Sequence, residues 1–205
     1  MPITISPDLL KAAVLFTSKE ETRYYLKGVS IQATPATIKV AATDGHRLFV
    51  ARENQEENTE TFSIIIPSET IATATKGVKY CHLELSKISE TQWRLGDTIF
   101  TPIDGTFPEY SRIVPTSVSG ETAQYNPEYI AGLGKANKLL GGSNTATIGY
   151  NGDKPALVTG DGYKAHNALA VLMPMRSAAE DWATILNAAM GDGFAISPEP
   201  IALAA

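Results

Sequence analysis

The chain has 205 residues, 43% hydrophobic and 19% charged, which supports one or two globular domains and excludes a disordered or collagen-like protein. Its single cysteine excludes a disulfide framework and a zinc site of four thiolates. Seventeen Lys and Arg against 22 Asp and Glu give a net charge of −5, which argues against a large basic surface for nucleic acid but not against a local basic lining.

The N-terminal segment lacks the basic and apolar regions of a signal peptide. No stretch reaches the about 18 unbroken apolar residues that a membrane span needs. These two features predict a cytoplasmic protein with no membrane partner.

The first periodic segment is a helix. Ser6 is its expected N-cap and Pro7 its first residue, and an apolar stripe from Leu9 to Phe16 continues it to about Ser18. Runs of β-forming residues separated by turn residues then predict an antiparallel meander. Its strands are expected at 23–33, 37–43 and 46–53.

The same order of elements follows a second time. After a polar loop at 53–60, a short strand at 61–67 and a helix at 68–76 are expected. Three strands complete this second copy, at 81–88, 92–97 and 98–104. Residues 1 to about 103 therefore contain two units of strand, helix and three strands, a repeat of architecture and not of sequence.

A third copy begins after about ten irregular residues. A strand is expected at 120–125, followed by a helix at 127–141 that Asn126 caps. Three further strands are expected at 145–150, 155–160 and 165–174. The sequence contains no fourth copy, and residues 177–205 predict one amphipathic helix and an apolar, proline-containing tail, with Trp182, Ile185, Leu186 and Ala189 on one helix face.

Asp44 and His46 are the one pair that suggests metal or acid–base chemistry. The Asp44-Gly45 dipeptide more simply predicts a tight turn, because it supplies the positive φ that hairpins need. The motifs of serine hydrolases, nucleotide-binding loops and zinc proteases are absent from the sequence. We therefore expect no enzyme activity, no catalytic residue, no metal and no cofactor.

Two patterns leave a structural and a functional interpretation open. The Met173-Pro174-Met175 run could cap a core or line an adaptable groove for apolar peptide anchors. Each predicted helix also carries lysines, which are typical of a solvated face but would track DNA phosphates if the helices lined one concave surface.

Four separated segments, in the same order, resemble the bacterial DNA polymerase III beta subunit, the sliding clamp. They are TRYYLKGV at 22–29, VAATDGHRLFVA at 40–51, GTFPEYSRIVP at 105–115 and VLMPMR at 171–176. The resemblance implies an α+β DNA-clamp fold of about one and a half domains, with helices on one face of antiparallel sheets. Residues 1–115 resemble the middle clamp domain, 116–177 resemble half of the last domain, and 178–205 form an additional segment.

The resemblance also implies a DNA polymerase processivity factor. Such a protein binds double-stranded DNA without sequence specificity, forms oligomers, and tethers DNA polymerase or repair proteins through a peptide groove; a clamp loader is a further candidate partner. By motif, the groove would be formed by Leu26, Thr43, Gly45, His46, Arg47, Leu48, Pro108, Arg112, Ile113, Leu172, Met173, Pro174, Met175 and Arg176.

Within this groove, apolar residues would form the floor and cationic ones the rim. The expected floor consists of Leu48, Ile113, Leu172 and Met173, and the rim of His46, Arg47, Arg112 and Arg176. On the helix side, Tyr24 and Tyr25 match positions near DNA in the family, although buried tyrosines in a strand are the simpler interpretation. The lysines expected to track DNA are Lys11, Lys19, Lys76, Lys135 and Lys138.

The sequence departs from the family in three ways. It continues for 28 residues beyond the point where the family typically ends, it carries Pro67-Ser68-Glu69 where clamps often carry basic residues, and it contains only half of a last domain. A half domain leaves open sheet edges, which a second subunit or the tail would cover. A ring of six complete domains would need four such chains.

These departures support a second hypothesis, a clamp mimic. Such a protein would bind clamp-interacting peptides without encircling DNA. The reduced basic character and the half domain favour it, whereas the lysines on the helices and the tyrosine pair favour a clamp.

Overall fold

The computed structural model of the chain describes residues 2–55, 60–78, 82–176, 184–185 and 188–189. The chain divides into two units, Met1–Met175 and Arg176–Ala205. All helices and strands named below belong to the first unit. The helix expected after residue 177 lies largely outside the described residues, as do Trp182 and Leu186. None of the described helices is long and apolar enough to cross a membrane.

The first repeat unit is present as a strand, a helix and three strands. They are β1 (Ile3–Ile5), α1 (Pro7–Val14), β2 (Gly28–Ala33), β3 (Thr37–Thr43) and β4 (Arg47–Asn54). Helix α1 starts at Pro7 as predicted but ends at Val14, because the next N–H groups bond to carbonyls three residues back. The Ser6 side chain makes no capping hydrogen bond.

The strand predicted at 23–33 is wrong in its first part. Tyr24–Leu26 forms a 3-10 helix, η1, and β2 begins at Gly28. The Leu26 N–H donates to Arg23 O and the Lys27 N–H to Tyr24 O, at 2.8 and 3.0 Å. Strand β5 pairs with β2 and ends at Pro67, which lies opposite Gly28. The residues before Gly28, including η1, therefore have no strand of this sheet to pair with.

The second unit has the same order of elements. It comprises β5 (Phe62–Pro67), α2 (Ser68–Ala74), β6 (Leu83–Lys87), β7 (Trp93–Leu95) and β8 (Thr98–Phe100). The two units exchange their first strands: β1 joins the sheet β1-β6-β7-β8, and β5 joins β2, β3 and β4. The predicted architectural repeat is confirmed, and the exchange makes the two units one domain.

The third unit differs from the prediction at both ends. It comprises α3 (Pro127–Leu139), β9 (Thr147–Gly149), β10 (Ala156–Thr159), a short helix α4 (Asp161–Ala165) and β11 (Ala168–Leu172). Residues 120–125 form no strand, and the strand predicted at 165–174 begins only at Ala168, because α4 ends at Ala165 and a turn follows it.

Strand β11 pairs antiparallel with β4, from Ala168 opposite Ala51 to Leu172 opposite Arg47. One seven-stranded sheet, β5-β2-β3-β4-β11-β10-β9, therefore runs through the first and third units. Along β11, the open side expected for a half domain is covered by the chain's own β4. This corrects the expectation that a second subunit or the tail must cover it; the remaining edge of the third unit is β9.

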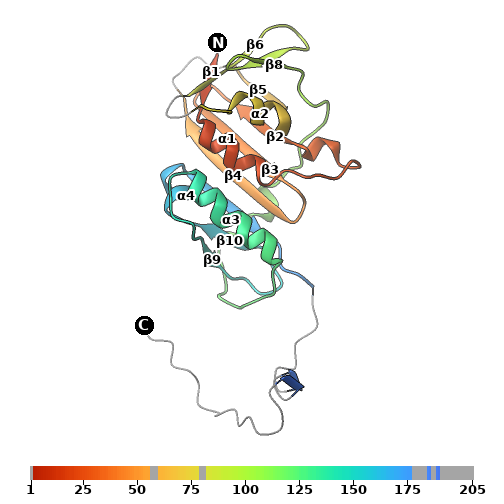
Figure 1. Cartoon of the computed structure of the whole chain (residues 1–205), viewed down its shortest axis with the longest axis vertical. Coiled ribbons are helices and arrows are strands. Elements are labelled where there is room, and N and C mark those ends of the chain that lie inside the picture. Colours follow the sequence, from red (N-terminus) through yellow and green to blue (C-terminus); the bar gives the residue numbers. More distant parts are fainter. Residues whose placement is uncertain (1, 56–59, 79–81, 177–183, 186–187, 190–205) are drawn as a thin grey trace. The chain divides into compact units, whose positions relative to one another are not determined.

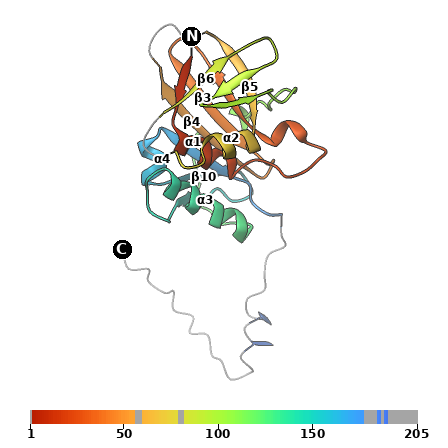
Figure 2. The same ribbon diagram turned by 45° about the horizontal axis from the view of Figure 1, so that its top comes forward.

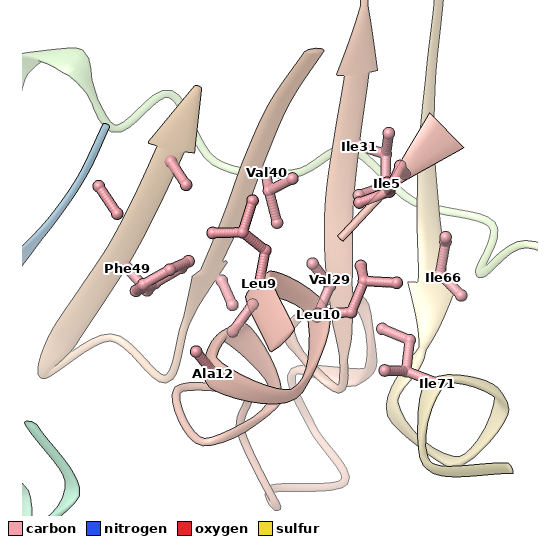
Figure 3. Packing of buried hydrophobic residues seen from close by; sticks show 14 of the residues in the cluster. Ile5, Leu9, Leu10, Ala12, Val29, Ile31, Val40, Phe49, Ile66 and Ile71 are labelled. Atoms are coloured by element: carbon pink, nitrogen blue, oxygen red, sulfur yellow. The ribbon is translucent and has the colours of Figure 1, made fainter. Parts of the chain in front are cut away.

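The helices form a layer on one side of the sheets. Helix α1 packs on β2, β3 and β4 and contacts both α2 and α3 (Figures 1 and 2). Figure 3 shows Leu9 of α1 lying between Val40, Val29 and Phe49 of the sheet. Each of these four side chains is fully buried, so this contact is the centre of the core.

A polar cluster joins the parts of the third unit. The fully buried Asn137 of α3 donates through its amide to Ser143 O, Thr145 O and Asp161 Oδ1, at 2.9, 2.9 and 2.6 Å. Its Oδ1 accepts the Tyr163 N–H at 3.2 Å. The bond from Asn137 is the main cause that lowers the pKa of Asp161. These bonds fix α3 against the turn before β9 and against α4.

Candidate functional site

The hairpin between β3 and β4 is a tight turn held by the Asp44 side chain. Asp44 Oδ1 accepts the N–H groups of His46 and Arg47, at 2.9 and 3.0 Å. Gly45 has φ +91°, a conformation in which a side chain is strained. The predicted turn at Asp44-Gly45 is confirmed, and its carboxylate is used within the turn.

Arg47 connects this turn to two helices. Its Nε donates to Asp44 Oδ2 at 3.0 Å and its Nη2 to Leu15 O, after α1, at 2.6 Å. The guanidinium carbon lies 5.1 Å from the centre of the Phe16 ring and 4.9 Å from that of Tyr129, in α3. The side chain is 13% exposed. Arg47 was expected at the rim of a peptide groove; instead it is held on the helix side as a structural connection.

Helix α3 carries a glycine where Arg47 approaches it. A Cβ atom at Gly132 would collide with the Arg47 guanidinium. Gly132 is buried in the interior of α3, where alanine normally gives the more stable helix. The close approach of Arg47 is therefore the physical reason for a glycine here.

His46 is exposed at the tip of the hairpin and stacks on Tyr129, with ring centres 5.7 Å apart and an interplanar angle of 21°. Its carbonyl accepts the Met173 N–H at 2.9 Å. Burial and the negative charge of Asp44 raise the pKa of Tyr129, and the positive charge of Arg47 opposes this shift. Sequence analysis missed Tyr129, because no local pattern links it to a hairpin about 80 residues earlier in the chain.

The register of β4 and β11 decides which residues face away from the helices. Leu172 lies opposite Arg47 and belongs to the core on the helix side, together with Phe49. Leu48 lies opposite Val171. Because side chains alternate along a strand, Leu48 and Val171 share the outer face of the sheet. Leu172 was expected in the groove floor; the structure instead places it in the core on the helix side, and Leu48 and Val171, which face the other way, are each 1% exposed.

The β4–β11 pairing thus brings two of the three groove segments together. The hairpin residues Thr43 to Leu48 lie beside the start of the MPMR motif, and Met175 is 54% exposed. Met173 and Pro174 are half-buried, and Leu26 is buried in η1. Arg176 belongs to the second unit, so its place beside the other groove residues is not described.

The third groove segment, after β8, contains Pro108, Arg112 and Ile113. Arg112 and Ile113 lie in a second 3-10 helix, η2 (Ser111–Ile113), and Ile113 is 40% exposed. Glu109 in this segment accepts the Ser111 N–H at 2.9 Å. This bond, the Ser111 hydroxyl and the charges of Arg112 and Lys39 lower the pKa of Glu109. Lys39 lies in β3 between Ile38 and Val40, which belong to the core beside α1, so its own side chain is on the outer face of the sheet.

A hollow on the helix side lies between the end of α1, the start of α2 and α3. It has a volume of about 900 Å³ and brings Tyr24, Lys19 and Lys135 of the predicted DNA-contacting residues to one surface. Its lining carries the cations Lys19, Lys27, Arg47 and Lys135 and the carboxylates Glu69 and Glu128, together with the hydroxyls of Thr17, Ser18 and Ser68. Lys27 was missed by sequence analysis; it pairs with Glu21.

The remaining predicted DNA contacts do not line this hollow. Lys11 is held by Asp8 and by Val78 O, at 3.3 and 3.2 Å, so its ammonium is already bonded. Lys76 and Lys138 are exposed. Tyr25 is half-buried and packs edge-on against Tyr24, which is 53% exposed; neither lies in a strand.

No group of three or more His, Cys, Asp or Glu that could hold a metal ion occurs in the described ranges. The Asp44 and His46 pair is accounted for by the turn and by the stack on Tyr129. The described residues thus offer two candidate surfaces on opposite sides of one sheet: the hollow on the helix side, and the outer face, where Met175 is exposed and Leu48 and Val171 are buried.

Comparison with known proteins agrees with this arrangement. The family described as DNA polymerase III beta subunit, central domain, matches residues 6–109. The beta sliding clamp of Haemophilus influenzae is 30% identical over 127 residues, which cover 54% of this chain and 32% of that protein. The clamp of Synechococcus elongatus is 28% identical over 146 residues, covering 67% of this chain and 39% of that protein.

Solved structures extend the match beyond the central domain. The crystal structure of the Bacillus subtilis DNA polymerase sliding clamp aligns with a TM-score of 0.66 at 16% identity, covering 87% of this chain and 65% of that one. The alignment therefore reaches into the third unit, for which the likeness concerns the fold. The chain spans about a third of the length of the curated relatives that it matches.

Proposed function

The chain belongs to the DNA polymerase III beta subunit family, and we propose that it acts as a compact, sliding-clamp-like processivity factor. In this role it binds duplex DNA without sequence specificity through its helix side and tethers a polymerase or repair protein through its outer face. The observation that carries the proposal is the pairing of β4 with β11, which brings together two of the segments that resemble the clamp family, 40–51 and 171–175, within a clamp fold.

The helix-side hollow supports the DNA part of the proposal. Its lining carries four cations and two carboxylates, but Lys27 pairs with Glu21 and Arg47 with Asp44, so the DNA part of the proposal rests on Lys19 and Lys135. Lysines act as point charges that attract phosphates and do not read base edges, so binding would be non-specific and sensitive to salt. Tyr24 offers an exposed ring beside these lysines for packing on sugars or bases.

The outer face supports the tethering part. Leu48 and Val171 lie on this face but are buried, each 1% exposed, so its accessible apolar surface is that of the half-buried Met173 and the exposed Met175, just after β11. Unbranched thioether side chains adapt to varied apolar anchors, and the intervening Pro174 keeps the backbone extended. The proposed partner is a short peptide segment of a polymerase or repair protein, with a clamp loader as a further candidate.

The proposed role needs no catalytic group. The only candidate pair, Asp44 and His46, is engaged in the turn and in a ring stack. A clamp mimic is the second candidate function. It is favoured by the negative net charge and by a match that covers only about a third of the curated relatives.

Retention on circular DNA separates the two functions. We expect the protein to stay on a nicked circle, with a loader if required, and to leave when the circle is cut. The double variant Lys19→Glu, Lys135→Glu should lose retention, because it reverses two charges of the hollow. Lys87→Glu, Lys164→Glu is the matched control, since both lysines are exposed away from it. Equal affinity for circular and linear DNA, or none for either, contradicts the clamp and favours the mimic.

Peptide binding tests the outer face independently of DNA. We expect Met173→Ala, Met175→Ala to weaken binding of a clamp-binding peptide at least tenfold, measured by fluorescence anisotropy. Ile88→Ala, at a similarly exposed isoleucine in another part of the surface, should leave the affinity unchanged. Unchanged affinity in the double methionine variant would remove the groove from the proposal.

A further inference from the structure

A small polar pocket lies where the end of β4 meets the turn between α4 and β11. It has a volume of about 290 Å³, near the lower limit for small-molecule sites. Its lining combines Arg52 to Gln55 at the end of β4, Thr4 of β1, His82 just before β6, and Ala165 to Asn167. All three repeat units therefore contribute to it, at the opposite end of β4 from the Asp44 hairpin.

Hydrogen bonds between these segments hold the walls of the pocket in place. The Arg52 N–H donates to Asn167 O at 3.2 Å, and Gln55 Nε2 donates to Thr4 O at 3.3 Å. Asn167 has φ +47°, a left-handed conformation that few residues with a side chain adopt. The end of β4 is thus tied to β1 on one side and to the start of β11 on the other.

The pocket is rich in hydrogen-bond donors that have no partner. In the described part of the chain, no hydrogen bond or ion pair engages the side chains of Arg52, His82 or His166. Arg52 and His82 are exposed and His166 is half-buried. A guanidinium offers five N–H donors in a fork that matches a tetrahedral oxyanion, and each imidazole adds at least one more. Such a surplus of donors favours a ligand whose atoms are acceptors.

Glu53 is the one carboxylate in the lining. Its Oε2 is buried and has no hydrogen-bond partner among the described residues. Burial raises the pKa of Glu53, and a backbone bond from Ser6 and the charge of His82 oppose this shift by less. The single charge that would repel an anion is therefore one that the pocket itself disfavours.

We propose that this pocket binds a phosphate-sized tetrahedral oxyanion, either inorganic phosphate or the phosphoryl group of a small molecule. Arg52 supplies the permanent positive charge, and His82 and His166 supply donors from the second and third units. Because the bound anion would contact all three units, it would stabilise their junction. This site is independent of the proposed clamp role and lies away from both surfaces that the role uses.

Titration calorimetry with inorganic phosphate at constant ionic strength tests the site. Arg52→Gln should weaken binding at least tenfold, because the forked donor is lost. Arg94→Gln is the matched control, since it removes the same charge at an exposed position on β7 outside the pocket. Absence of binding to the original protein, or an equal loss in both variants, would overturn the proposal.

The same titration with phosphoserine distinguishes the two sources of the anion. Tighter binding than inorganic phosphate would identify the phosphoryl group of a small molecule as the ligand. Equal or weaker binding would identify phosphate itself.

Glu53→Gln gives a test of sign. It removes the charge that repels an anion, so phosphate should bind at least twofold more tightly to this variant at neutral pH. A site for a cation would instead lose its carboxylate. Weaker phosphate binding to Glu53→Gln, in a protein that circular dichroism shows to be folded, would overturn the proposal.

Sulfate tests the part of the two histidines, because its own charge is constant around neutral pH. The ionisable groups of the lining are Arg52, Glu53, His82 and His166, and imidazoles in general gain a charge below about pH 6.5. Sulfate should therefore bind at least fivefold more tightly at about pH 6 than at about pH 8, and the double variant His82→Ala, His166→Ala should lose this difference. Equal affinity of the original protein at both pH values would overturn the assignment.

Discussion

The complete domain and the third unit are built from the same order of elements but are stabilised differently. In residues 1–103, exchanged strands and a helix layer enclose an apolar core centred on Leu9 and Phe49. In the third unit, a smaller apolar contribution is supplemented by the buried amide of Asn137, and an apolar hollow remains beside β9. The comparison teaches that the same order of elements is held by strand exchange in one region and, in the other, by pairing with β4 and by a buried polar cluster.

The largest expected effect contrasts two fully buried leucines. Leu9→Ala should lower the free energy of unfolding toward the upper end of the about 2–5 kcal/mol found for such changes, because α1 is enclosed on several sides. Leu133→Ala should fall toward the lower end, since Leu133 already borders the hollow beside β9. Urea denaturation measures both. Equal losses would show that the third unit is as closely packed as the complete domain.

The next effect concerns the contact between the two regions. Arg47→Met should cost about 1.5–3 kcal/mol, as expected for hydrogen bonds of a charged group, because Asp44 and Leu15 O lose their donor. Gly132→Ala should also destabilise the protein, since its Cβ would collide with Arg47. In the Arg47→Met background, however, Gly132→Ala should stabilise by up to about 1 kcal/mol through helix propensity. Additive effects in this cycle would contradict the contact.

A smaller effect compares the starts of two helices. Asn126 caps α3 by accepting the Glu128 N–H at 2.9 Å, whereas the Ser6 side chain makes no such bond to α1. Asn126→Ala should therefore cost about 1 kcal/mol, and Ser6→Ala should change the stability little. Thermal unfolding distinguishes the two. A loss at Ser6 as large as at Asn126 would mean that both helices depend on their caps alike.

The smallest effect is a dependence on pH at the end of β4, where the two regions meet. Burial raises the pKa of Glu53 above its ordinary value of 4.5. A backbone hydrogen bond from Ser6 and the charge of His82 lower it, but by less. The folded chain therefore binds this proton more tightly than the unfolded chain, and stability falls as pH rises from the ordinary pKa through the raised one. Glu53→Gln should be more stable than the original protein at about pH 7 and lose that advantage by about pH 4.

Glu109 provides the control of opposite sign. Bonds from Ser111 lower its pKa, so its contribution to stability is present above the ordinary pKa and is lost as pH falls through the lowered one. Glu109→Gln should accordingly remove stability at neutral pH, where Glu53→Gln adds it. Urea denaturation at the two pH values measures both, and changes of the same sign would contradict one of the two assignments.

Much of the fold could be predicted from local pattern. Apolar periodicity and caps located α1, α2 and α3, alternation located most strands, and Asp44-Gly45 identified the hairpin. For the candidate site, the motifs identified the segments around 43–48 and 171–175 that β4 and β11 bring together. The peptide and DNA roles of these residues remain predictions, to be tested by the binding experiments above.

The tertiary structure decided what depends on a distant partner. Residues 120–125 were predicted as a strand but form none, because their backbone groups bond to loop residues instead: Gly120 to Tyr150, Glu121 to Gly152 and Gln124 to Met175. Arg47 faces the helices, and Val171 replaces Leu172 on the outer face, because the register between β4 and β11 sets which side each residue occupies. The sequence by itself determined the repeat and its turns, which follow from local geometry. Pairing between segments over 100 residues apart determined which side chains meet.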